Sequence, residues 1–529
     1  MKILLQDPHC WIDCLKLELN GSDPSDCRVR PDEGLSAVGE LCPGSLYVPS
    51  GTSIFSSLIK FFANEHGYDA NSLIGMPYDW RLAPLQLQQR DMFLTTLKFR
   101  LETAIKMHGL PAIVISHSMG TNLFLYFVEW LKVNEGKGWR KWLRKHVGAF
   151  IGIAAPLLGS PGSIKSVLSG HTFGLTISEA QAKELELSFP STHFLNPRSS
   201  RQEYDYSDPI ALFRSASGGM NMSFGVEDIE NGEIFRVVGS IYQDKDLSHK
   251  HTNLHELYLS DPINPLGVLP QRPPVQHVVM VYGVDVSTEV GYVYRMHDSD
   301  GSTEGGPLLE EIYMEEPCSE PSPIMESGPM GDDLCYLNET VEMEAFIDIC
   351  KVDMERKVLR RVSSVEGRRE TPIDKSCRSN IVSVSNKLMS QRKRFHRKGQ
   401  AHRSGDGSVP YLSLQFAHSW LEGERWEEHR PARVRHPWPK LMAAHTVDPA
   451  TDIYHSRRPD GDTTEVAEIV GLNHIEICSN AYLHEEFVEP MVQRVFAEAR
   501  RRQRRARKSL PMLERLKKWW GRVESSIES

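Results

Sequence analysis

Residues 112–120 read Ala-Ile-Val-Ile-Ser-His-Ser-Met-Gly and end in a small-x-Ser-x-Gly pentapeptide. Such a pentapeptide between a strand and a helix is typical of a nucleophile elbow, in which a serine sits on a tight turn with its hydroxyl exposed. The backbone N–H after the serine then lies at the positive end of the helix dipole. The pattern predicts that Ser118 is a nucleophile of acyl chemistry and that the Met119 N–H donates to an oxyanion.

The same pentapeptide also arises by chance in a chain of 529 residues, and its first position is Ser116 where glycine is usual. The neighbouring residues favour the functional interpretation. The β-branched run 113–115 suits a buried parallel strand. The residues that follow the pentapeptide place apolar side chains at helical spacing, at Leu123, Phe124, Phe127, Val128 and Leu131.

A serine nucleophile needs a base, and the base needs a carboxylate that orients it. On the fold that carries such elbows, the chain order is serine, then Asp or Glu, then His. Asp406 in Gly-Asp-Gly-Ser-Val-Pro and His474 in Gly-Leu-Asn-His-Ile-Glu-Ile follow in this order. Both motifs are expected to present their side chains from loops.

Other residues compete for these two roles. The chain has 21 histidines, so a histidine is more often structural than catalytic. His117 is a poor base, because on such a turn its side chain points away from the Ser118 hydroxyl. Rival carboxylates lie in a loop of less defined geometry, at Asp448, Asp452, Asp460 and Asp462.

The elements that would position these residues alternate between helices and strands. Helices are expected over 53–66, 86–108 and from the elbow to 133, and strands over 113–115, 147–153 and 278–283. Residues 291–294 are expected to be a hairpin partner of the last strand, and residues 1–50 to form short strands and loops. The alternation predicts an α/β fold, specifically an α/β-hydrolase fold with a mostly parallel, doubly wound sheet.

The composition divides the chain into four parts. Residues 1–295 are expected to hold the first part of the core, with a cap over about 160–275. Residues 296–403, acidic and then basic, are expected to be a long, largely disordered insertion. Residues 404–498 carry the second part of the core, with Asp406 and His474. Residues 499–529 form a basic amphipathic tail, which suits either an anionic membrane surface or a solvated helix.

The bulk properties exclude several classes of protein. The hydrophobic content of 40% supports a sizeable core, and the net charge of −9 argues against general nucleic-acid binding. No window reaches about 18 consecutive apolar residues, so no transmembrane helix is expected. The apolar part of the N-terminus is too short for a signal peptide. Nine cysteines show no metal-ligand spacing, and both disulfides and free thiols remain open.

Further motifs accompany the elbow and stand in a fixed order along the chain. They are Pro-Tyr-Asp-Trp-Arg-Leu at 77–82, the elbow at 116–120, Ala-Ala-Pro-Leu-Leu-Gly at 154–159, Tyr-Gly-Val at 282–284 with Tyr-Val-Tyr at 292–294, and the Asp406 and His474 motifs. Together, and in this order, they resemble the lecithin:cholesterol acyltransferase superfamily over residues 10–295 and 404–492. The branch most similar is phospholipid:diacylglycerol acyltransferase, which also tolerates a non-glycine residue two positions before the serine.

The resemblance implies a role for each matched position. Ser118 would be the nucleophile, Asp406 the orienting acid and His474 the general base. The oxyanion donors would be the backbone N–H groups of Met119 and Leu35. In the Pro-Tyr-Asp-Trp-Arg-Leu motif, Asp79 and Arg81 would form an ion pair beside the site, and Trp80 would line the acyl pocket. No cofactor and no metal are implied.

The resemblance also implies a reaction and a location. A fatty acyl group would move from a phospholipid to diacylglycerol through an acyl-serine, giving triacylglycerol and lysophospholipid. Alternatives within the superfamily are a phospholipase A-type hydrolase and a sterol acyltransferase. An alternative of another class is a catalytically impaired, membrane-associated binding protein. The partners would be the two lipids and a membrane surface, with no nucleic acid and no obligate protein partner, at the endoplasmic reticulum membrane.

Members of this branch usually begin with a cytosolic tail, a membrane-spanning helix, a first core strand and a disulfide-closed lid. The matched motifs place these features upstream of Cys10, which would correspond to a lid cysteine. The sequence is therefore expected to be a truncated form or an incomplete gene model.

Overall fold

The structure is a computed structural model of the 529-residue chain. The residues that it describes are 8–18, 20–40, 53–172, 177–200, 209–215, 221–242, 258, 260–263, 269–296, 307–315, 341–346, 358–363, 381–384, 403–435 and 446–505.

The main sheet contains six strands in the order β1-β2-β5-β15-β14-β11. Strands β1, β2, β5 and β15 are parallel neighbours, and β14 and β11 add antiparallel pairs at one edge. Every residue of β2 and β5 is buried, as expected for parallel strands covered on both faces. The strands are β1 Ala112–His117, β2 Val147–Ile153, β5 His277–Val284, β11 Glu424–Arg430, β14 Thr451–Arg457 and β15 Thr463–Val470.

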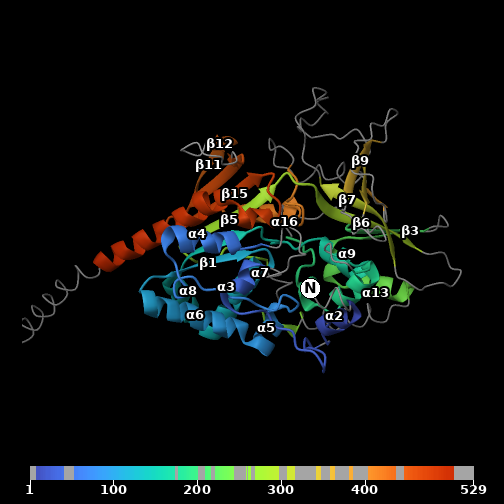
Figure 1. Cartoon of the computed structure of the whole chain (residues 1–529), viewed down its shortest axis with the longest axis horizontal. Coiled ribbons are helices and arrows are strands. Elements are labelled where there is room, and N and C mark those ends of the chain that lie inside the picture. Colours follow the sequence, from blue (N-terminus) through green and yellow to red (C-terminus); the bar gives the residue numbers. More distant parts are fainter. Residues whose placement is uncertain are drawn as a thin grey trace, which may run out of the picture.

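Helices cover both faces of this sheet (Figure 1). Along β2 the side chains alternate between two hydrophobic clusters. Phe150 packs in the cluster with α6, α7 and α8, and Ile151 packs in the cluster with α4 and the helical residues 489–505. The covering helices are α4 Ser56–His66, α6 Phe93–His108, α7 Met119–Glu135 and α8 Trp139–His146, with the short turn η1 Gly136–Gly138 between the last two. The predicted α/β-hydrolase fold is thus confirmed.

The predicted helix over 86–108 is wrong in one respect, because it is two helices. Helix α5 Pro84–Asp91 ends at Met92, and α6 begins directly after it. Met92 has a φ of 54°, in the left-handed region, which turns the chain between the helices. Its N–H donates to Gln88 O, and its carbonyl accepts from Thr96 N, so one residue caps both helices.

The predicted strands near the N-terminus are also wrong for the residues that the structure describes. This part of the chain contains the helices α2 Pro8–Leu15 and α3 Gly34–Gly39, and a disulfide joins Cys14 to Cys27. Cys10 is exposed.

Residues 291–294 do not form the predicted hairpin with β5. Both edges of β5 are already occupied, by β2 and by β15, so no place remains for a hairpin partner. The chain turns at Asp285, whose φ is 64°, and enters a second sheet as β6 Thr288–Met296.

The second sheet has seven strands in the order β4-β3-β6-β7-β10-β8-β9. Four of these strands lie in the predicted insertion, namely β7 Leu308–Glu315, β8 Val341–Phe346, β9 Val358–Ser363 and β10 Ile381–Val384. Besides β6, the remaining two are β3 Ala211–Ser215 and β4 Met222–Phe224, in the predicted cap. Apart from these strands and residues 296, 307 and 403, the insertion lies outside the described residues, so the expected disorder there stays a prediction.

The predicted cap between β2 and β5 is mainly helical. Its helices are α9 Gly162–Leu168, α10 Glu179–Glu186, α11 Pro190–Phe194, α12 Val226–Glu230 and α13 Glu233–Ile241. The remaining elements are α16 Tyr411–Gln415, η3 Phe416–Trp420, β12 Arg433–Arg435, β13 Thr446–Asp448, α17 Glu476–Ser479, α18 Ala481–Leu483 and η4 His484–Val488.

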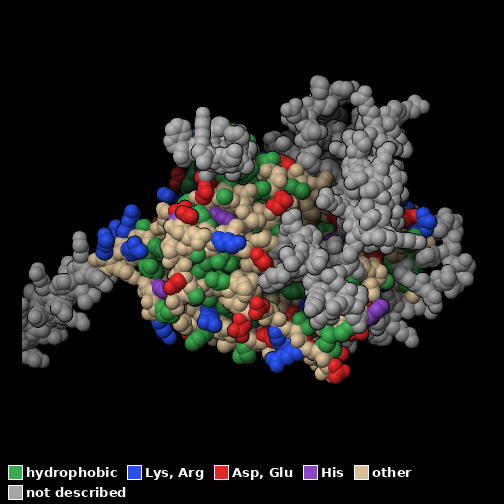
Figure 2. Space-filling view, viewed as in Figure 1, with side chains coloured by type: hydrophobic (Ala, Val, Ile, Leu, Met, Phe, Trp, Pro, Cys, Tyr) green, Lys and Arg blue, Asp and Glu red, His purple; other side chains and the backbone are tan. Residues whose placement is uncertain are grey.

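The final described helix carries basic side chains at its outer end. Figure 2 shows Lys and Arg gathered there, and Arg500, Arg501 and Arg502 are exposed. The expected amphipathic tail beyond residue 505 lies outside the described residues. Within the described parts of the chain, no helix is long and apolar enough to span a bilayer.

Candidate active site

Ser118 stands on a sharp turn between β1 and α7. Its backbone has φ 52° and ψ −129°, a conformation that costs a non-glycine residue of order 1–3 kcal/mol. The Ser118 N–H donates to Ile153 O at 2.9 Å, and the Ser118 carbonyl accepts from Thr121 N at 2.9 Å. These bonds hold the turn in place against its strain.

The small residues around the serine explain why Ser116 can replace a glycine. A Cβ atom built on Gly120 would lie 3.9 Å from the Ser116 Cβ, so the strand and the helix pass close together. Ser116 is buried, and its Oγ lies 2.9 Å from Thr121 Oγ1. The two hydroxyls satisfy each other inside the turn. Thr121 was not predicted from the sequence, where its one local signal is a hydroxyl three positions after Ser118.

The structure brings Ser118, Asp406 and His474 together. His474 Nε2 lies 2.9 Å from Ser118 Oγ, and His474 Nδ1 lies 2.7 Å from Asp406 Oδ2. Asp406 lies on the loop before α16, and His474 lies on the loop between β15 and α17. This hydrogen-bonded chain has the order of atoms in which a carboxylate orients an imidazole and the imidazole accepts a proton from a hydroxyl.

The Asp406 carboxylate is completely buried and firmly held. Its Oδ1 accepts hydrogen bonds from Ser408 N at 3.1 Å and Val409 N at 2.8 Å. Its backbone carbonyl accepts from His474 N at 2.8 Å, so the acid and the imidazole are joined through both side chain and main chain.

His117 contacts the backbone of His474 and not the Ser118 hydroxyl. Its Nε2 lies 2.8 Å from the His474 carbonyl oxygen. Burial and the proximity of His474 lower the pKa of His117 to about 3, so the ring is neutral. A neutral ring in this contact must carry its proton on Nε2 and donate it to the carbonyl. His117 therefore supports the loop that presents His474.

The two predicted oxyanion donors differ in their surroundings. Met119 is the first residue of α7, where the N–H has no partner within the helix. Its side chain packs against Ala83, Phe194 and Tyr258. Leu35 lies in the first turn of α3, where its backbone packs against Gly75. The donor roles of Met119 and Leu35 both stay predictions.

Asp79 and Arg81 belong to a buried network of charges. Arg81 is 1% exposed and donates to Asp79 Oδ2 at 2.7 Å and to Asp23 Oδ1 at 2.9 Å. Burial opposes ionisation of Asp79, but the hydrogen bonds and charges of Arg81 and Arg90 hold the pKa of its carboxyl below the usual range. Trp80, in contrast, is 54% exposed and contacts Phe189 edge to face, so its place in an acyl pocket stays a prediction.

The rival carboxylates face other partners. Asp452 pairs with Arg403 and His429, and Asp462 makes two bonds of 2.7 Å to Arg144.

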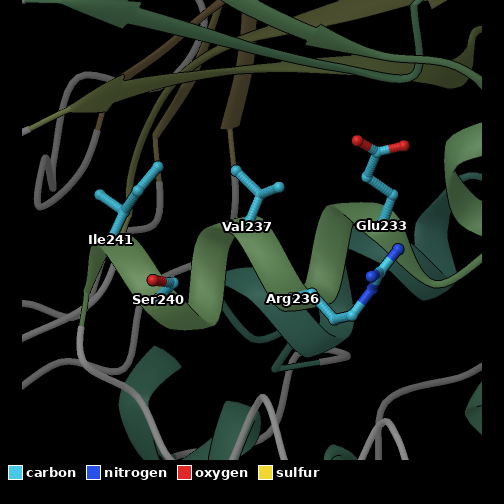
Figure 3. Close-up of a pocket in the computed structure, with 5 residues that line it drawn as sticks. All are labelled: Glu233, Arg236, Val237, Ser240 and Ile241. Carbon is cyan, nitrogen blue, oxygen red and sulfur yellow. The ribbon is translucent and has the colours of Figure 1, made fainter.

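A hollow of about 320 Å³ lies along α13 (Figure 3). Its lining residues all come from that helix, namely Glu233, Arg236, Val237, Ser240 and Ile241. Within the described residues, no cluster of three or more His, Cys, Asp or Glu side chains is arranged to hold a metal ion.

Comparisons with known proteins extend the resemblance. The family described as Lecithin:cholesterol acyltransferase matches residues 1–334. The chain is 35% identical over 343 residues to a phospholipid–sterol O-acyltransferase of Arabidopsis thaliana, covering 55% of this chain and 53% of that protein. It is 25% identical over 349 residues to the phospholipid:diacylglycerol acyltransferase of Saccharomyces cerevisiae, covering 57% and 51%.

A third relative is named both as a phospholipase A and as an acyltransferase. The lysosomal phospholipase A and acyltransferase of Bos taurus is 26% identical over 198 residues, covering 36% of this chain and 46% of that protein. The chain thus spans about half the length of each of these curated relatives.

Proposed function

The chain belongs to the lecithin:cholesterol acyltransferase family, and we propose that it is an O-acyltransferase that takes a fatty acyl group from a phospholipid and carries it on Ser118. The observation that carries this proposal is the hydrogen-bonded chain from Ser118 Oγ through His474 to Asp406, with distances of 2.9 and 2.7 Å. The names of the relatives supply the donor class.

In the first step His474 Nε2 takes the proton of Ser118 while Oγ attacks an ester carbonyl of the phospholipid. The charge that develops on the carbonyl oxygen is stabilised by the Met119 N–H, and one such donor is typically worth about 3 kcal/mol. The ester bond then breaks. His474 returns the proton to the leaving oxygen, lysophospholipid departs, and an acyl-serine remains.

In the second step the acceptor alcohol occupies the place of the leaving group. His474 takes the proton of its hydroxyl, the oxygen attacks the acyl-serine carbonyl, and the new ester leaves as Ser118 regains its proton. Asp406 accepts a hydrogen bond from the imidazole Nδ1–H, so Nε2 is the nitrogen that takes and returns the proton in both steps.

Two acceptors are candidates. The relative with 35% identity is named for a sterol acceptor, and the relative with 25% identity over a similar length is named for diacylglycerol. The higher identity to the relative named for a sterol favours a sterol as the acceptor. Diacylglycerol, which the motifs favour, is the second candidate. Water is the competing acceptor at any acyl-serine, so hydrolysis follows wherever the site admits it.

The test uses purified full-length protein and vesicles with an acyl-labelled phospholipid. Sterol, diacylglycerol or neither is added, and the products are separated. Label in sterol ester supports the first acceptor, and label in triacylglycerol supports the second. Label in free fatty acid alone, with both alcohols present, would reject the transferase and leave a phospholipase. The endoplasmic reticulum location is a further proposal, which imaging of the tagged protein tests.

A further inference from the structure

Glu315 holds both ends of the loop that carries Asp406. It is the last residue of β7 and is 4% exposed. Its Oε2 accepts hydrogen bonds from Gly405 N at 3.1 Å and from Tyr411 N at 2.9 Å. Gly405 precedes Asp406 directly, and Tyr411 begins α16. One carboxylate oxygen therefore accepts hydrogen bonds from both ends of residues 405–411, which we call the acid loop.

Thr288 contacts the same loop from the neighbouring strand. It is the partner of Glu315 in the antiparallel register of β6 and β7, and it is completely buried. Its Oγ1 accepts from Gly407 N at 2.8 Å and donates to Val286 O at 2.7 Å. The two cross-strand partners therefore bind backbone N–H groups on both sides of Asp406.

The position of this loop decides the position of the Asp406 carboxylate. The bonds to its Oδ1 come from Ser408 and Val409 of the same loop, so a shift of the loop moves the carboxylate with it. A Cβ built on Gly405 would overlap Val409 O and lie 2.9 Å from Thr288 Oγ1, so the loop is tightly enclosed.

We propose that Glu315, supported by Thr288, is a positioning residue for the reaction, fixing the acid loop so that Asp406 meets His474 Nδ1. The inference rests on the proposed function of Ser118, Asp406 and His474. Glu315 lies 90 residues before Gly405, in the segment between the two parts of the core. That segment therefore acts on the loop of Asp406 through the second sheet.

The experiment measures how fast a fluorophosphonate probe labels Ser118 in the full-length protein. The variants are Glu315→Ala, Glu315→Gln, Thr288→Val and Thr288→Ser. The matched control is Glu311→Ala, on the same strand, whose carboxylate pairs with Arg214 at 2.8 Å and is partly exposed. The concentration dependence separates the maximal labelling rate from the half-saturating probe concentration, and thermal unfolding reports the folded fraction.

The Glu315→Ala variant is expected to lose about 100-fold in maximal labelling rate, the scale of a misplacement of about 1 Å. The half-saturating concentration stays unchanged. Glu315→Gln keeps an acceptor oxygen and recovers most of the rate. Thr288→Val keeps the shape of the side chain but loses its hydroxyl and is slower than Thr288→Ser. Glu311→Ala labels like the wild type.

Equal labelling rates of folded Glu315→Ala and wild type would overturn the positioning role. If Glu315→Ala does not fold, Thr288→Val decides: a wild-type rate in the folded variant overturns the inference, and a slower rate rescued by Thr288→Ser supports it. A wild-type protein that is not labelled at Ser118 is a different result, because it rejects the proposed function itself.

Discussion

The geometry around Asp406 predicts the outcome of an isosteric substitution, Asp406→Asn. The backbone N–H groups of Ser408 and Val409 point at Oδ1, so the amide oxygen of the new side chain must occupy that position. The amide NH₂ then faces His474 Nδ1, at the place of the present 2.7 Å contact. Because Nδ1 must accept this bond, the imidazole proton moves to Nε2, and the ring can no longer take a proton from Ser118.

The size of the effect follows from the cost of the flipped amide. Turning the NH₂ towards Ser408 and Val409 leaves the buried Val409 N–H and the partly buried Ser408 N–H without an acceptor, and a buried N–H left in this way costs about 1–3 kcal/mol. The productive tautomer is thus disfavoured by about 2 kcal/mol, which is about 30-fold. In a serine-protease triad, the corresponding Asp-to-Asn change, which fixes the wrong tautomer, lowers kcat by about 10⁴-fold. We expect the maximal rate to fall by a factor between these limits.

The assay is steady-state transfer of labelled acyl groups from phospholipid vesicles, with thermal unfolding as the check on folding. Asp462→Asn is the matched control, because that carboxylate is also buried but bonds to Arg144. The control is expected to keep the wild-type rate per folded molecule. A folded Asp406→Asn variant within about 10-fold of the wild-type rate would refute the reasoning, since that loss is below the cost of the flipped amide.

Three further predictions concern stability. Arg81→Met removes one of the cationic partners of the buried carboxylates of Asp79 and Asp23 and is expected to cost up to about 3–5 kcal/mol in urea unfolding, whereas Arg214→Met, at a partly exposed pair, costs less than about 1 kcal/mol. Equal costs would contradict this account of the network. Burial raises the pKa of Glu186 to about 7, so the folded state holds a proton that the unfolded state releases, and stability falls as pH rises from about 4.5 to about 7. Glu186→Gln should flatten the dependence of the melting temperature on pH in that range. An unchanged dependence would show that Glu186 does not cause it. Replacing Cys14 and Cys27 by Ser opens a loop of 13 residues and is expected to lower the free energy of unfolding by about 3 kcal/mol. An unchanged midpoint of denaturant unfolding would disprove this.

The parts of the site that the sequence predicted are those with local signals. Ser118 is marked by a β-branched strand before it and a helical pattern after it, and the structure has β1 and α7 there. Asp406 and His474 stand in loops whose small or turn-forming neighbours are visible in the sequence. A local pattern of this kind depends only on residues a few positions apart.

The parts that could not be predicted depend on distant residues. Glu315 reaches the acid loop across 90 positions, and no local pattern marks it. Residues 291–294 look like a strand next to β5, but only the full order of the sheet reveals that β2 and β15 already occupy its edges. At Met92 the apolar spacing is helical on both sides, so the sequence hides the left-handed residue between two helices.

The central claim is that an acyl group travels on Ser118. The most direct measurement incubates the full-length protein with a labelled phospholipid and no acceptor, quenches in acid, and maps the modified peptide by mass spectrometry. The account predicts an acyl ester on Ser118 that disappears when sterol or diacylglycerol is added and is absent from Ser118→Ala. Product formation by folded Ser118→Ala at the wild-type rate, or an acyl group on another residue, would contradict it.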